Sequence, residues 1–285
     1  MISLTFTNSE GTSIEMNNTF PYVLQKPEGI MGNGVITQID RAFAQNGVNY
    51  YGSLDDARII NLTVYFNYAT VVAGKEAQRD IMTIFNPRFG LGELVYEDDY
   101  VKYKIAAVVS LKPVVYNIEG VTMMSAFDVV FTCPDPDWLS YTATQTYLIG
   151  VTGGLVFPAT FPITFGTVGG AGTISYDGDN PAKLIIDFRV QTAGVQMTRP
   201  RIVNELGEYI EIDKTVLEGE KILVDTNPNA PSITHIDLVG EETDIWEDLV
   251  YGSTFFQLHR GDNIFLFSSA TGASEVYLTS NEHYA

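Results

Sequence analysis

The feature that most constrains the fold of this chain is a pair of prolines, Pro134 and Pro136, directly after a strand-like stretch at residues 126–132. Proline has no backbone N–H to donate to a sheet ladder, so two prolines in three residues end a strand. The chain has 285 residues, more than one hydrophobic core usually serves. We therefore predict a first domain at residues 1–138, a linker at 139–162 and a second domain at 163–285.

The residues on both sides of these prolines indicate a mainly β protein. Tyr, Phe, Val, Ile and Thr are abundant, and these residues favour pleated, half-buried surfaces. Residues 60–66 alternate aliphatic and polar or aromatic side chains, which predicts a strand with one buried face. Further strands are expected at 94–96, 102–109 and 126–132. The first domain is thus predicted to be β-sandwich-like.

One segment of the first domain has a helical pattern. Between Gly74 and Asn86, apolar residues recur at i, i+4, i+7 and i+8, starting from Ala77, and charged residues occupy the opposite face. Pro87 should end the helix, because proline disfavours helical geometry in the residue before it. We expect one amphipathic helix lying on the core.

The second domain shows short apolar runs separated by Gly, Asn, Asp and Pro turns, at the spacing of a β-sandwich. The runs lie near Ile163, Ile174, 184–190, Ile202, 209–212, 222–224, 233–238, 255–258, 263–267 and 276–279.

The charge of the chain limits its partners. Sixteen basic and 35 acidic residues give a net charge of −19, which repels nucleic-acid phosphates and anionic membranes. The N-terminus has no signal-peptide pattern, and no apolar stretch is long enough to span a bilayer. The one cysteine, Cys133, permits no internal disulfide, which suits synthesis in a reducing cytoplasm.

The segment from Gly29 to Gly52 predicts an extended loop or arm. Five glycines separate apolar and aromatic residues there, and exposed aromatics are costly unless another surface covers them. A neighbouring subunit could supply that cover.

No segment carries the pattern of a catalytic, metal or cofactor site. Cys133 ends a Phe-rich strand and is best interpreted as a buried apolar residue. Asp177-Gly178-Asp179-Asn180 lacks the glutamate that would close a calcium loop, so a hairpin turn is preferred. Gly169-Gly170-Ala171-Gly172 precedes a strand-like run and not a helix, so we expect a flexible hairpin there, not a phosphate cradle.

A cluster of acidic residues surrounds Trp246 and could supply the two carboxylates of a glycosidase. A solvated acidic loop is the preferred interpretation. The cluster comprises Glu241, Glu242, Asp244, Glu247 and Asp248.

Taken in order, these segments resemble the distal tail protein of long-tailed, siphovirus-type bacteriophages. The match is firmest from Arg58 to Trp138 and includes 85–90 (Phe-Asn-Pro-Arg-Phe-Gly) and 131–138 (Phe-Thr-Cys-Pro-Asp-Pro-Asp-Trp). Shorter matches lie at 217–221 and 255–263.

The resemblance implies a ring-forming first domain with an extended arm and a galectin-like β-sandwich as second domain. It implies a structural virion protein at the tail tip, made in the bacterial cytoplasm and without enzymatic activity or cofactor. The ring, usually a hexamer, would join the tail tube protein to the tail-tip protein and to a receptor-binding protein, and DNA would pass through it unbound. Candidate subunit contacts are Ile30, Met31, Phe43, Tyr50 and Tyr51.

Two alternatives remain open at this point. The second domain could be a carbohydrate-binding module, with Trp246, Tyr251 and Phe256 as the candidate aromatic residues, although core packing is the simpler interpretation of them. The chain could also be a glycoside hydrolase on a jelly-roll scaffold, which requires two carboxylates in one groove.

Overall fold

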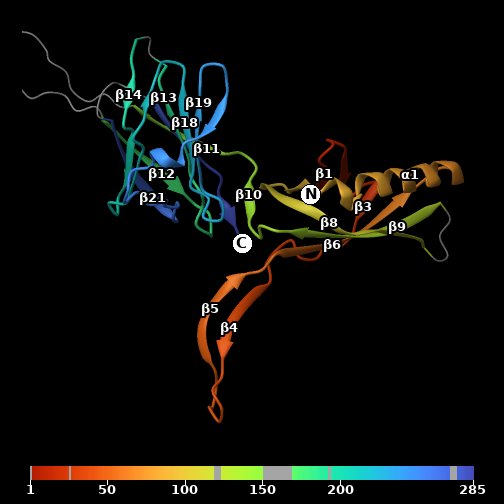
Figure 1. Cartoon of the computed structure of the whole chain (residues 1–285). Helices are drawn as coiled ribbons and strands as arrows, with labels where there is room; N and C mark the ends of the chain where they lie inside the picture. The colour runs from red at the N-terminus through yellow and green to blue at the C-terminus, as the bar shows by residue number, and fades with distance from the viewer. Residues whose placement is uncertain (1, 26, 119–122, 150–168, 192–193, 270–274) are drawn as a thin grey trace, which may run out of the picture. The chain divides into compact units, whose positions relative to one another are not determined.

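The computed structural model describes residues 2–25, 27–118, 123–149, 169–191, 194–269 and 275–285. The chain divides into two compact units (Figure 1). The first domain contains Met1–Tyr141 together with Tyr284–Ala285, and the second contains Thr142–His283. The first domain therefore extends past its predicted end, and the chain returns to it at the C-terminus.

The first domain is built from strands and one α-helix among its described residues. Its elements are β1 (Ser3–Thr7), β2 (Ser13–Met16), β3 (Tyr22–Leu24), β4 (Val35–Asp40), β5 (Asn49–Asp55), β6 (Arg58–Asn67), α1 (Val71–Ile84), the 3-10 helix η1 (Pro87–Phe89), β7 (Leu91–Glu97), β8 (Lys102–Asn117), β9 (Met124–Cys133) and β10 (Trp138–Ser140).

Nine strands of the chain form one sheet around the core of the first domain. Seven follow the order β2-β1-β7-β8-β9-β6-β3, β10 pairs with β8, and the last strand, β23 (His283–Tyr284), pairs with β10. The two edge strands approach each other, because Asn17, just after β2, forms a bridge with Val23 of β3. The sheet therefore comes close to closing into a barrel, which removes most of its exposed edge.

Helix α1 covers one face of this sheet (Figure 1). The Thr70 side chain accepts a hydrogen bond from the N–H of Ala73 and caps the helix, so α1 begins before the predicted Gly74. Beyond its end, the Phe85 ring stacks on Phe6 and meets Phe131 edge-on. The expected amphipathic helix is confirmed.

The second domain contains strands and one 3-10 helix among its described residues. Its elements are β11 (Thr144–Ile149), β12 (Gly169–Tyr176), β13 (Ile185–Arg189), β14 (Met197–Thr198), β15 (Arg201–Asn204), β16 (Tyr209–Glu211), β17 (Thr215–Val216), β18 (Lys221–Asp225), β19 (Ser232–Ile236), β20 (Glu242–Asp244), η2 (Trp246–Asp248), β21 (Gly261–Ser268) and β22 (Glu275–Ser280).

Two sheets of the second domain enclose a single apolar core, so the predicted β-sandwich is confirmed. One sheet has the order β11-β22-β13-β18-β19-β20 and the other the order β12-β21-β15-β16. Buried residues of both sheets meet between them, as in the contact of Phe188 with Phe267 at a centroid distance of 6.0 Å.

Four predicted features of this domain differ from the structure. Residues 144–149 of the expected linker form β11, which pairs with β22, while 150–162 and the strand near Ile163 lie outside the described residues. Residues 169–172 belong to β12 and are not a hairpin. Residues 177–180 connect β12 to β13 in the other sheet and so are not a hairpin turn. Residues 255–258 form no strand, only one bridge from Leu258.

Candidate assembly and binding surfaces

The predicted arm is a β-hairpin formed by β4 and β5. The strands pair antiparallel from Val35 with Asp55 to Asp40 with Asn49. Every residue of β4 is exposed, and only Gly52 in β5 is partly covered. The hairpin therefore packs little of itself against its own domain. The expected extended segment is present, but paired strands replace the loop that its glycines predicted.

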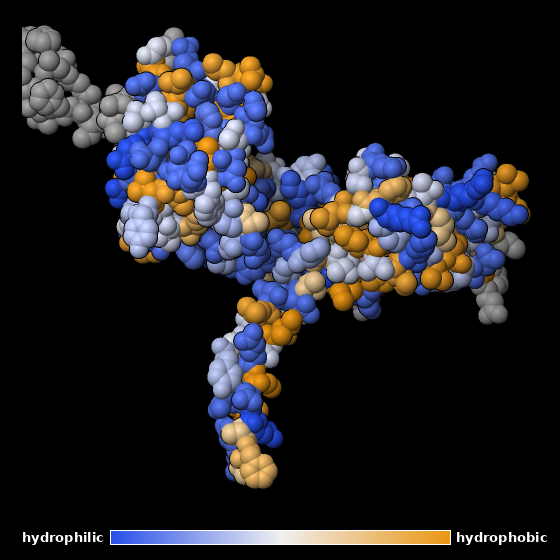
Figure 2. Space-filling view, viewed as in Figure 1, coloured by the Kyte–Doolittle hydropathy of each residue, from blue (hydrophilic) through white to orange (hydrophobic). Residues whose placement is uncertain are grey.

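Apolar and aromatic side chains line this exposed hairpin from its root to its tip (Figure 2). Phe43, at the tip, is fully exposed, and Tyr50 and Tyr51 are exposed to 64% and 66%. The remaining large apolar residues of the hairpin at least 46% exposed are Val35, Ile36, Ile39, Val48 and Leu54. So many exposed apolar side chains on one projecting element mark a contact surface.

A bulge in the hairpin sets which side chains share a face. The pairing shifts between Gln38 and Ile39, so that Ile39 pairs with Tyr50 and Tyr51 is the extra residue. Directly paired residues lie on one face, which places Ile39 beside Tyr50, whereas Ile36 and Leu54 pair on the other face. The hydroxyl groups of Tyr50 and Ser53 lie 2.6 Å apart. The hairpin thus presents apolar groups on both faces.

The root of the hairpin is fixed to the sheet by Arg58, whose side chain is fully buried. Its Nη1 donates to the carbonyl oxygen of Ile30 at 2.7 Å, and its Nε donates to that of Pro136 at 2.6 Å. Trp138 Nε1 donates to the same Ile30 oxygen at 2.9 Å. Burial lowers the pKa of Arg58, against the opposing effect of Cys133 and Asp137. These bonds tie the segment before β4 to the start of β6 and to residues 136–138, which follow the end of β9 at the same end of the sheet.

The five predicted contact residues therefore fall into two groups. Met31 is exposed to 69%, and Phe43, Tyr50 and Tyr51 are exposed as described above. Ile30 is different: its side chain is 7% exposed and belongs to the core of its own domain. Arg58 and Trp138 both donate hydrogen bonds to its carbonyl oxygen. Because the Ile30 side chain is buried in its own subunit, we remove it from the set of predicted contact side chains.

A second partly exposed surface, with an exposed apolar residue at each end, was not predicted from the sequence. It lies on the face of the nine-stranded sheet opposite α1. Leu91 pairs with Val108, Val108 with Thr132, and Thr132 with Ile59, so these residues form one row across β7, β8, β9 and β6. Ile59 and Leu91 are each 55% exposed. We call the four residues of this row the sheet-face row.

The three aromatic residues proposed for carbohydrate binding do not form one surface. Phe256 is buried in the core and stacks on Phe265, so it cannot contact a ligand. Trp246 is half exposed and stacks on Phe255 with an interplanar angle of 7°. Tyr251 is fully exposed. Phe256 is therefore a core residue, which is the simpler of the two interpretations of its aromatic side chain.

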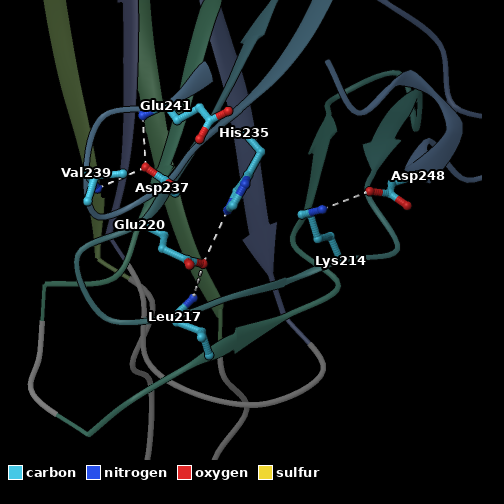
Figure 3. A network of polar contacts seen from close by, with 8 residues as sticks. All are labelled: Lys214, Leu217, Glu220, His235, Asp237, Val239, Glu241 and Asp248. Carbon is cyan, nitrogen blue, oxygen red and sulfur yellow. Dashed lines mark hydrogen bonds and ion pairs between the residues drawn. The ribbon is translucent and has the colours of Figure 1, made fainter. Parts of the chain in front are cut away.

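Two acidic side chains near Trp246, Asp244 and Asp248, hold local structure, and Figure 3 shows the ion pair of Asp248. Asp248 forms an ion pair with Lys214 at 3.2 Å, and Asp244 accepts a hydrogen bond from the N–H of Trp246. Nearby, Glu220 contacts His235 at 3.2 Å and accepts from the N–H of Leu217, as drawn in the same figure. These contacts shape loops of the second domain.

The other residues considered as candidate reactive or metal-binding groups take part in core packing or ion pairs. Cys133 is fully buried, and desolvation raises the pKa of its thiol to about 11. Asp177 and Asp179 both approach Arg260 at 3.6 Å. Among the described residues, no group of three His, Cys, Asp or Glu side chains could hold a metal ion. No helix in the described part of the chain is long and apolar enough to cross a membrane.

Comparisons with known proteins relate this architecture to viral tails. Residues 9–133 match the family model described as phage tail protein RIFT-related domain. The chain matches the crystal structure of SPP1 Dit (gp 19.1), described as a paradigm of the hub adsorption apparatus in phages that infect Gram-positive bacteria. That match has a TM-score of 0.69 and 12% identity, and it covers 100% of both chains.

The baseplate of phage P2 in its activated conformation gives two further matches. The calcium form matches with a TM-score of 0.50 and 10% identity over 97% of each chain. The strontium form matches with the same score and identity, over 97% of this chain and 98% of the other. At such identities the structural likeness shows a shared fold. No curated protein sequence is significantly similar to the chain.

Proposed function

We propose that the protein is the distal tail hub of a long-tailed phage, on the premise that residues 9–133 match the phage tail protein RIFT-related domain. The whole chain shares the fold of SPP1 Dit, a hub protein by its description. Its role is structural, as a component of the distal tail of the virion. We infer that its chemistry is association and not catalytic turnover.

The observation that carries this proposal is the exposed apolar hairpin. A two-stranded hairpin alone is at best marginally stable in water, because it buries little apolar surface. The hairpin β4–β5 is exposed on both faces, yet it carries Phe43, Tyr50 and Tyr51. Covering it with a neighbouring copy would bury these side chains, and aromatic residues are enriched in such interface cores.

The arrangement favours a ring. The hairpin and the sheet-face row are different surfaces of one subunit, so a contact that joins the hairpin of one copy to the sheet face of the next is head-to-tail. Head-to-tail contacts close into rings when the rotation between copies permits it. The resemblance to distal tail proteins suggests six subunits.

The proposed partners follow from this position in the tail. One face of the ring would contact the tail tube protein and the other the tail-tip protein, and the second domain would be available to a receptor-binding protein. The net charge of −19 would let DNA pass through the ring without binding its phosphates.

Mass measurement of the purified full chain in solution tests the proposal. At micromolar concentration we expect a multiple of 31.4 kDa by native mass spectrometry, and rings in negative-stain images. A strict monomer that also fails to form rings with tail-tube and tail-tip proteins would contradict the hub hypothesis.

Substitution in the hairpin tests its part in assembly. Changing Tyr50 and Tyr51 to Ala should shift the protein toward monomer while leaving its circular dichroism unchanged, because neither side chain is buried in its own subunit. Tyr100→Ala is the matched control, since Tyr100 is 94% exposed but lies outside the hairpin. Equal assembly of both variants would remove the hairpin from the proposed contact.

A further inference from the structure

The outward face of the six-stranded sheet in the second domain carries an aromatic pair that the hub function does not require. Tyr147 of β11 and Tyr277 of β22 are paired in register, and their rings lie 4.8 Å apart at an angle of 31°. Tyr147 is 41% exposed. Two adjacent tyrosines form a platform that is apolar on its ring faces and polar at its hydroxyl groups.

A polar group lies beside this platform on the same face. Asp187 of β13 pairs in register with Tyr277, and its sequence neighbours Ile186 and Phe188 are fully buried in the core. Because side chains alternate across a strand, Asp187 projects to the outward face. Arg189, two residues further along the same face, lies with its guanidinium group 4.7 Å from the centre of the Tyr277 ring.

The hydrogen bonds of Asp187 leave one of its oxygen atoms without a partner. Arg189 Nε donates to Asp187 Oδ2 at 2.7 Å, and Arg189 Nη2 donates to the same oxygen. Asp187 Oδ1 has no hydrogen-bond partner among the described residues, although the residue is only 6% exposed. A buried carboxylate oxygen without a donor is unfavourable, and a ligand hydroxyl group that reached it as Arg189 shifted would remove that cost.

The remaining groups complete a set of donors and acceptors. The Tyr277 hydroxyl group donates to Glu275 Oε2 at 3.0 Å. Burial, and then the Glu275 carboxylate, raises the pKa of Tyr147 to about 12. Beside Arg189 a cavity of about 280 Å³ is lined by Arg189, Val190, Gln191, Gly219, Glu220 and Lys221. Its volume approaches the lower end of known ligand pockets, ~300 Å³.

We propose that this face, around Tyr147, Tyr277 and Asp187, binds a neutral saccharide. The platform offers ring faces to the C–H groups of a sugar, and Asp187, Arg189 and Glu275 offer hydrogen-bond partners to its hydroxyl groups. On this face the carboxylates of Asp187 and Glu275 are balanced by Arg189 and its register partner Lys221, so no net positive charge favours an anionic ligand. The proposal goes beyond the hub function and does not depend on ring formation.

Saturation-transfer NMR on the full chain tests this site, with glucose, galactose and N-acetylglucosamine as neutral probes and glucuronic acid as the anionic one. We expect transfer to at least one neutral probe, and a loss of about tenfold in affinity, or ~1.4 kcal/mol, for Tyr277→Ala. Tyr147→Ala serves as a second variant because its exposed side chain on an edge strand can be removed without loss of the fold.

Tyr251→Ala is the matched control, because Tyr251 is fully exposed and its ring lies outside the platform. It should bind as the unchanged protein does. The proposal is overturned by no transfer to any neutral probe, by stronger transfer to glucuronic acid, or by Tyr147→Ala and Tyr277→Ala variants that both bind as tightly as the unchanged protein. None of these outcomes bears on the hub function, which is measured by mass.

Discussion

The side chains of Arg58 and Trp138 donate hydrogen bonds to one and the same acceptor, the carbonyl oxygen of Ile30. The guanidinium group also lies 6.0 Å from the centre of the indole ring. Residues far apart in the sequence thus meet at the root of the hairpin, one from the start of β6 and one from the start of β10. The hairpin can project because its root is held this firmly.

The two donors should contribute unequally to stability. Trp138→Phe removes one hydrogen bond while Arg58 still serves the Ile30 oxygen, so we expect a loss of about 1 kcal/mol in the free energy of unfolding. Arg58→Met removes the donor to Ile30 and also leaves the Pro136 oxygen without its donor. We therefore expect a loss of about 2–4 kcal/mol in the free energy of unfolding. Scanning calorimetry measures both losses. Arg88→Met, at an exposed arginine, is the control and should be nearly neutral.

Two glycines near this root should respond differently to alanine. A Cβ atom on Gly29 would collide with the carbonyl oxygen of Ile59, which is backbone and cannot yield, whereas one on Gly32 meets nothing. Both have positive φ, so both variants carry about 1 kcal/mol of backbone strain. We expect Gly29→Ala to cost clearly more than Gly32→Ala.

Urea unfolding followed by Trp138 fluorescence measures that difference, in a Trp246→Phe background that leaves one tryptophan to report on the first domain. Equal losses for the two glycine variants would contradict the close approach of Gly29 to β6.

Cys133 should be unreactive in the folded protein. Its pKa of about 11 leaves only about one thiol in a thousand ionised at pH 8, and the residue is fully buried. A maleimide reagent should therefore label it only after denaturation. Rapid labelling of the native chain at pH 8 would show that the strand end opens.

The same shift predicts a pH dependence of stability. The neutral thiol is favoured in the folded state, so its contribution is complete below the ordinary pKa of 9.0 and is lost as the pH rises through about 11. Cys133→Ala should lose less stability between pH 9 and 11 than the unchanged protein, as measured by urea unfolding at each pH.

The two faces of the hairpin can be tested separately. Ile39→Ser alters the face that carries Tyr50, and Ile36→Ser alters the face that carries Leu54. If a neighbouring copy covers both faces, each change should weaken assembly, measured by native mass spectrometry as a larger monomer fraction. Leu206→Ser, at a residue 73% exposed in the second domain, is the control. An effect confined to one face would show that the partner lies on that face alone.

The sequence predicted the elements whose periodicity is local. The alternation at residues 60–66 and the helical spacing after Ala77 each reflect one buried face, and β6 and α1 lie where these patterns indicated. The hairpin was less visible, because its exposed faces impose no apolar alternation and its glycines suggest a loop. The strand character of residues 169–172 was hidden for a similar reason, since glycines there give no side-chain pattern.

Contacts between distant residues could not be predicted in this way. Nothing local to Ile30 shows that Arg58 and Trp138 bind its carbonyl group, so its burial came only with the structure. The same holds for Phe256, whose burial depends on Phe265. Tyr147 lay in the predicted linker, and its pairing with Tyr277 became visible only when β11 joined the sheet. The exposed residues Met31, Phe43, Tyr50 and Tyr51 remain predictions as subunit contacts.

The return of the chain to its first domain as β23 has a consequence for how such proteins exchange domains in evolution. Because the chain leaves after β10 and comes back in the strand that pairs with β10, the whole second domain is an insertion into a loop of the first. Domains whose termini lie close together tolerate this arrangement. A recombination event with one breakpoint after Tyr141 and one before β23 would exchange the second domain while leaving every strand of the nine-stranded sheet in place.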